Sequence, residues 1–126
     1  MLDAFLETVA ATPFVDGQTD CALTIADWVM AATGCPDPAD HLRGRYASAL
    51  QRERLLRRLG GLEVVVSYCA RRALLTETLE PLRGDIGVVR VGRQVLSAIC
   101  LGDRWAIKGE GVVVAAADHV YRAWRV

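Results

Sequence analysis

Apolar residues recur at helical spacing through the first half of the chain, and three segments follow this pattern. Residues 2–11 have apolar side chains on one side only, which predicts a short amphipathic helix. Residues 21–33 are apolar around most of the helix circumference, a pattern typical of a central, buried helix. Residues 46–59 predict a basic amphipathic helix with arginines outward and larger side chains inward, namely Tyr46, Leu50, Leu55, Leu56 and Leu59.

Residues 62–73 carry a mixed signal. The run Val64-Val65-Val66 favours a strand, whereas Ala70 to Ala73 and the flanking arginines favour a helix. No turn signal interrupts the segment, so we expect a helix there, with a strand as the alternative.

The pattern changes after Pro81, where short β-rich runs alternate with glycine turns. The runs cover residues 85–91, 94–101, 104–108 and 111–115, with a further run at 120–126. Short strands joined by tight turns predict an antiparallel meander. The chain is therefore expected to form one α+β domain, residues 1–126, with N-terminal helices packed on a small antiparallel meander.

Composition and charge argue against nucleic-acid binding, secretion and membrane insertion. The chain has 126 residues, is 52% hydrophobic and carries no formal net charge, so no bulk attraction to nucleic acid is expected. Asp3 and Glu7 in the first turns argue against a signal peptide, and no apolar run is long enough for membrane insertion. We expect a reducing environment at synthesis, and no cofactor.

The cysteines are widely spaced. They form no C-x-x-C pair and lie at no ligand spacing from a histidine, so neither a metal site nor a disulfide framework is expected. The four positions are Cys21, Cys35, Cys69 and Cys100.

Cys21 is the candidate nucleophile, because it follows the capping residues Thr19 and Asp20 and opens the central helix. Unpaired N–H groups and the positive end of the helix dipole favour a thiolate there. The same position also suits a small buried residue. A nucleophilic thiol needs a base. His119 is the candidate base, with a turn histidine as the alternative, and His41 is expected to be an exposed loop residue.

Three further residues are candidates for binding, each with a structural alternative. Asp20 precedes the thiol but is also a natural helix cap. Asp85 follows Gly84 and is also a natural strand start. Trp105 is an aromatic residue that suits either an interface or the core.

The order of these features resembles the NlpC-type papain-like cysteine peptidases, which are cell-wall amidase and endopeptidase domains. Asp20-Cys21 before an apolar helix matches the Asp-Cys nucleophile motif, and Gly84–Val89 matches the Gly-Asp strand opening. Residues 97–105 match the strand and hairpin that follow. The resemblance implies a papain-like fold. It also places Leu96 where the family has its catalytic histidine, and leucine cannot accept a proton, which implies an inactive site.

A closer resemblance is to a family of small phage and prophage proteins encoded among tail genes. The matching segments are PFVDGQTDCAL, ADW, TG, RGRY, GG, RGDIGVV and the terminal RAWRV. This resemblance implies a structural component of the virion at the tail tip or hub, made in the bacterial cytoplasm, with other tail proteins as partners. Two alternatives stay open: an active cell-wall cysteine peptidase or amidase that uses Cys21 on peptidoglycan, and a tail-assembly factor absent from the virion.

Overall fold

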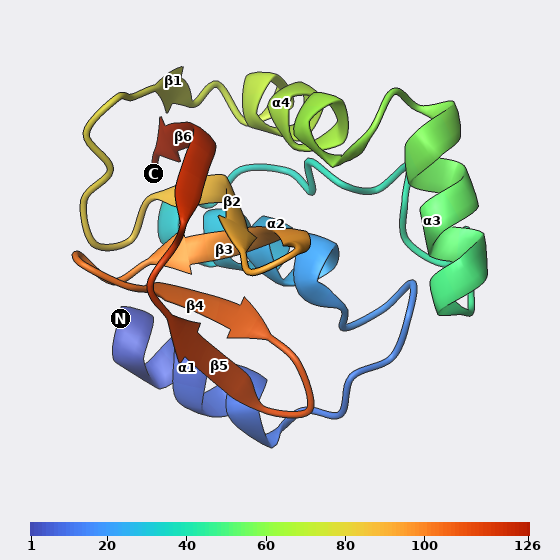
Figure 1. Ribbon diagram of the computed structural model, residues 1–126, viewed down its shortest axis with the longest axis horizontal. Helices are drawn as coiled ribbons and strands as arrows, with labels where there is room; N and C mark the ends of the chain where they lie inside the picture. Colours follow the sequence, from blue (N-terminus) through green and yellow to red (C-terminus); the bar gives the residue numbers. More distant parts are fainter.

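Four helices and six strands make up the computed structural model, which describes residues 1–126 (Figure 1). The helices are α1 (Leu2–Ala11), α2 (Cys21–Thr33), α3 (Ala49–Arg58) and α4 (Leu62–Arg72). The strands are β1 (Thr76–Glu77), β2 (Ile86–Val91), β3 (Gln94–Cys100), β4 (Trp105–Lys108), β5 (Val112–Ala115) and β6 (His119–Arg125). The predicted α+β class, with N-terminal helices on an antiparallel meander, is confirmed.

The strands form a single antiparallel sheet in the order β1-β6-β2-β3-β4-β5. Strands β2 to β5 are the predicted meander. Strand β6 crosses back to pair with β2, and β1 pairs with the outer side of β6. The two-residue strand β1 was not predicted, because its pairing with Trp124 and Arg125 is long-range and leaves no local pattern.

Helix α2 lies at the centre of the molecule. The Asp20 side chain accepts from the Leu23 N–H at its start, and Gly34 ends it in the left-handed conformation. Its apolar residues pack against one face of β2 and β3 in a core that includes Ile25, Trp28, Val29, Ile86, Val88 and Ile99. The prediction of a buried helix over residues 21–33 is confirmed.

The opposite face of the sheet holds a second apolar cluster around Trp105, because successive strand residues alternate between faces. Its indole lies against Gly87, where an added Cβ would be 2.8 Å from the ring. A glycine at this strand position therefore leaves the space that the Trp105 ring occupies.

The basic helix predicted over residues 46–59 is shorter in the structure, and two of the leucines expected to point inward are exposed. It begins at Ala49 after the Ser48 cap, and Tyr46 is buried in the preceding loop. Leu55 and Leu56 pack inward, but Leu50 and Leu59 are 60% and 41% exposed, which corrects the expected inward face. The expected helix over residues 62–73 is confirmed as α4. None of the four helices combines the length and apolar composition that crossing a bilayer requires.

Candidate functional site

The Cys21 thiol, the candidate nucleophile, lies at the N-terminus of α2, and its surroundings suppress its ionisation. Burial raises the pKa of the Cys21 thiol, and the negative charge of Asp20 raises it further. The charge of Arg52 and the hydroxyl of Ser97 act in the opposite direction without cancelling the rise. The thiol is therefore protonated at neutral pH, which is the opposite of an activated cysteine.

Ser97 on β3 is the residue that faces the start of α2. Its hydroxyl donates to the Cys21 carbonyl oxygen at 3.0 Å. Leu96 is on the opposite face of the sheet, where it packs with the Trp105 cluster. Leu96, which the resemblance places at the histidine position, therefore does not face the thiol, and the neighbouring Ser97 does. Ser97 is no base at neutral pH, so the position facing Cys21 still lacks a proton acceptor.

His119 begins β6 and pairs with Arg90 at the end of β2. Its ring packs edge-on against Tyr121 with centroids 4.6 Å apart. No hydrogen bond joins His119 to Cys21, and its charge has no part in the pKa shift of the thiol. The structure therefore does not bring the candidate nucleophile and the candidate base together as a catalytic pair.

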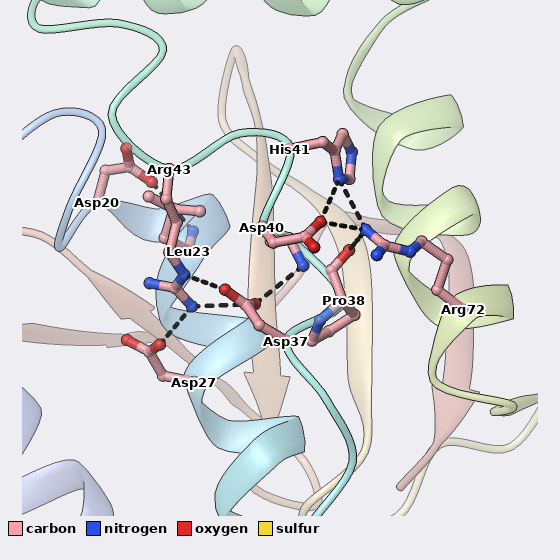
Figure 2. A network of polar contacts seen from close by, with 10 residues as sticks. Asp20, Leu23, Asp27, Asp37, Pro38, Asp40, His41, Arg43 and Arg72 are labelled. Carbon is pink, nitrogen blue, oxygen red and sulfur yellow. Dashed lines mark hydrogen bonds and ion pairs between the residues drawn. The ribbon is translucent and has the colours of Figure 1, made fainter.

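His41 belongs to a polar network that fastens the loop after α2, which Figure 2 shows. The Arg72 guanidinium donates to His41 Nδ1 at 3.0 Å, to Asp40 at 2.6 Å and to the Pro38 carbonyl at 3.1 Å. Because an arginine can only donate, a hydrogen bond between the two groups requires Nδ1 to be the acceptor. It is half-buried, contrary to the expected exposed loop position.

The other half of the network centres on Arg43. It donates to Asp27 at 2.6 Å and to Asp37 at 2.5 Å, so one guanidinium joins α2 to the following loop (Figure 2). Burial raises the pKa of Asp27, while hydrogen bonds from Arg43 and the Ala39 N–H hold the pKa of Asp37 below its usual range despite partial burial. The network is structural, since its charges are paired with one another.

Asp20 is fully buried and serves the fold. One carboxylate oxygen accepts from the Leu23 N–H at 3.0 Å; the other accepts from the Gly17 N–H at 2.9 Å and the Tyr46 hydroxyl at 2.5 Å. Burial and the Asp20 carboxylate together raise the pKa of Tyr46 strongly. Gly17 has φ of +81°, and an added Cβ would lie 2.1 Å from the Tyr46 carbonyl oxygen, so this loop requires glycine.

Asp85 is also buried, and it joins the start of β2 to the end of β6. It accepts from the Leu82 N–H at 2.8 Å, the Arg125 guanidinium at 2.9 Å and the Val126 N–H at 3.1 Å. Trp105 is 4% exposed. All three candidate binding residues are therefore inside the protein, and the carboxylates of Asp20 and Asp85 are used by the chain itself.

Lys108 is a buried cation that sequence analysis did not single out. It is the only lysine, and its ammonium donates to the Val9 carbonyl at 2.9 Å and to the Thr12 carbonyl. These are carbonyls of the last turn of α1 and its end, which attract a cation. A lone lysine within an apolar strand was the available signal. No group of three histidine, cysteine or acidic side chains lies close enough to hold a metal ion.

A groove of about 810 Å³ opens between the α3–α4 corner and the β2–β3 hairpin. Its apolar lining comprises Leu56, Leu62, Val95, Leu96 and Tyr121. The charged residues along it are Arg52, Glu53, Arg57, Glu63 and Arg93. Arg52 is paired with Asp16, whereas Arg57 and Arg93 form no ion pair. Sequence analysis missed this groove because its walls come from segments that are far apart in the chain.

Fold and site together define a small α+β domain whose central helix begins at a half-buried, protonated thiol. The chain belongs to the family described as Domain of unknown function (DUF6950), which matches residues 1–126. Comparison with curated proteins and with solved structures gave no match.

Proposed function

We propose that this protein is a non-catalytic structural component of a phage or prophage tail, built on an NlpC-like peptidase scaffold and bound to other tail proteins. The observation that carries the non-catalytic part is the Cys21 site, where burial raises the thiol pKa and Ser97 occupies the facing position. The tail location rests on the resemblance of the segments around Cys21 and Asp85 to phage tail-associated proteins.

The chemistry of the site supports binding over hydrolysis. A cysteine peptidase needs a thiolate and a base that takes its proton and returns it to the leaving amine. Here Cys21 has neither a base in contact nor a lowered pKa. The helix dipole alone has a modest effect and is outweighed by burial.

Thiol reactivity tests the non-catalytic proposal directly. We expect alkylation of Cys21 by iodoacetamide, followed by peptide mass spectrometry, to stay slow at pH about 8.5, the ordinary thiol range, and to become fast only at higher pH. We also expect no release of fragments from peptidoglycan that depends on Cys21, with Cys21→Ser as the matched control. Fast alkylation at pH 6, or cleavage lost in Cys21→Ser, would instead establish an active cysteine peptidase or amidase.

Location is tested separately, by mass spectrometry of purified particles from the encoding phage or prophage. We expect the protein at a stoichiometric ratio to known tail proteins. Its absence from particles, combined with a tail defect when its gene is deleted, would identify an assembly factor.

A further inference from the structure

Helix α1 forms the outer wall of a small cavity at the start of α2. The cavity has a volume of about 10 Å³, and Leu6 and Val9 of α1 close one side of it. The other walls come from the start of α2 and from β3, β4 and β5, and they include Cys21, Ser97 and Lys108. Helix α1 therefore covers the end of α2 at which the thiol lies.

Little buried surface holds α1 in this position. Leu2 is its only buried residue, whereas seven residues of α2 are buried. Phe5 packs on Trp28 with ring centroids 5.3 Å apart. Asp3 pairs with Arg83 at an exposed position, where an ion pair contributes little free energy. The apolar burial that docks α1 is therefore small compared with that of the central helix.

Lys108 is the polar anchor of α1. Its ammonium donates to the carbonyl oxygens of Val9 and Thr12 at the end of the helix, and no acidic group is among its hydrogen-bond partners. Lys108 is 5% exposed, and an ammonium has three N–H donors. Removing this charge from water is costly, and two neutral oxygens compensate the cost only in part. Release of α1 returns the ammonium to water, which lowers the free energy needed to open the helix.

The chain has a defined pivot between α1 and α2. Thr12 ends α1 in an extended conformation, and a proline follows it. The next residue is already held, because the Arg52 guanidinium lies over the Phe14 ring at 5.9 Å. The rest of the connection is closed by hydrogen bonds of its own, which end at the buried Asp20 cap. Helix α1, which lies beside β5 in Figure 1, can therefore swing about residues 12–13 while α2 stays in place.

We propose that α1 is a hinged cover, which opens while the sheet and α2 stay folded and which exposes Cys21 and Ser97 to solvent when it is released. Local opening at a free energy below that of global unfolding is common for elements with little buried surface. The cover makes access to the start of α2 conditional on the position of α1. This inference goes beyond the proposed tail function and does not rest on it, because the cover acts on the folded chain whatever its partners are.

Alkylation of two cysteines in one molecule tests the cover. The full chain is treated with iodoacetamide at pH about 8.5, in urea concentrations below the unfolding transition, and both rates are followed by peptide mass spectrometry. Cys100 is fully buried in the sheet, so it should react only through global unfolding, with a rate that rises steeply with urea. Cys21 should react faster than Cys100 and with a weaker dependence on urea, because opening of α1 exposes less surface.

Variants separate opening of the cover from unfolding of the whole chain. Leu6→Ala removes part of the cavity wall and should raise the Cys21 rate about tenfold. Lys108→Ala removes the anchor together with its apolar stem and should act in the same direction. Val66→Ala is the matched control, because Val66 is buried on α4 and does not line the cavity. It lowers global stability, so it should raise the Cys100 rate and leave the Cys21 rate unchanged.

Equal urea dependence at the two thiols, or a Val66→Ala variant that speeds both alike, would overturn the inference, because Cys21 would then be exposed only by global unfolding. A Cys21 rate that neither Leu6→Ala nor Lys108→Ala changes would also overturn it, since the thiol would then react with α1 docked. Hydrogen exchange gives a readout without the thiol: the amides of α1 should exchange with the same opening free energy as Cys21. None of these measurements uses peptidoglycan or particles, so their failure leaves the tests of the proposed function unaffected.

Discussion

Leu74 follows α4 in a conformation that leucine rarely adopts, with φ of +59°. The Leu74 N–H donates to the Arg71 carbonyl and the Leu75 N–H to the Ala70 carbonyl, which is the Schellman arrangement that ends many helices. Glycine usually occupies this position because it has no Cβ. Leu74 is also 90% exposed, so packing within the molecule does not offset the strain.

Replacing this leucine tests the strain. Leu74→Gly should stabilise the protein by about 1 kcal/mol, because the left-handed backbone no longer opposes a Cβ. Urea unfolding measures the change. Gly34→Ala is the mirror control: Gly34 ends α2 with φ of +73° and open space around its Cβ position, so it should lose about 1 kcal/mol. A neutral or destabilising Leu74→Gly would show that the side chain makes stabilising contacts.

The start of α2 shows how an element is held by one residue. Asp20 caps the helix and also joins the preceding loop, through Gly17, to the segment before α3, through Tyr46. Ser48 caps α3 by a single bond of 3.2 Å at an exposed position. The two caps do the same local task, but only Asp20 satisfies donors from three segments inside the core.

This difference predicts unequal costs of removing the caps. Asp20→Ala leaves buried donors unpaired and should cost about 3 kcal/mol or more, whereas Ser48→Ala should cost about 1 kcal/mol. Tyr46→Phe removes one of the bonds to a charged acceptor and should cost about 1.5–3 kcal/mol. Chemical unfolding of the three variants checks the order. Equal losses at Asp20 and Ser48 would mean that Asp20 acts as a cap alone.

For the whole molecule, the thiols and the Tyr46 hydroxyl whose pKa values are raised set the dependence of stability on alkaline pH. Burial raises the pKa of Cys69 to about 11, and the pKa values of Cys21 and Tyr46 are also raised. A group whose pKa is raised by folding stabilises the protein fully below its unfolded pKa. That contribution is lost as the pH rises from the unfolded to the folded value.

We therefore expect the urea midpoint to be constant from pH 6 to 8 and to fall above pH about 8.5, where unfolded thiols begin to ionise. Cys69→Ala should show a shallower fall, because one of the contributing groups is gone. Measuring unfolding midpoints for both proteins across this range checks the sign. A midpoint that rises with alkaline pH would contradict the burial of these groups.

The helices and turns followed from the sequence because their signals are local. Residues 21–33 form a helix since their own spacing, the Asp20 cap and the Gly34 stop act within a few residues. The strands between glycine turns were predicted for the same reason. The position of the Cys21 thiol at the start of a helix could therefore be predicted from local sequence alone.

What only the tertiary structure decided is which side chains meet. Ser97 faces Cys21 and Leu96 does not, because strand register depends on pairing partners such as Val88, and a shift of one residue exchanges the two faces. Arg72 contacts His41, and Tyr46 contacts Asp20, across stretches of chain that carry no shared pattern. The sequence alone determined where the elements lie, since those interactions are short-range; the chemistry of the Cys21 site was decided by long-range packing.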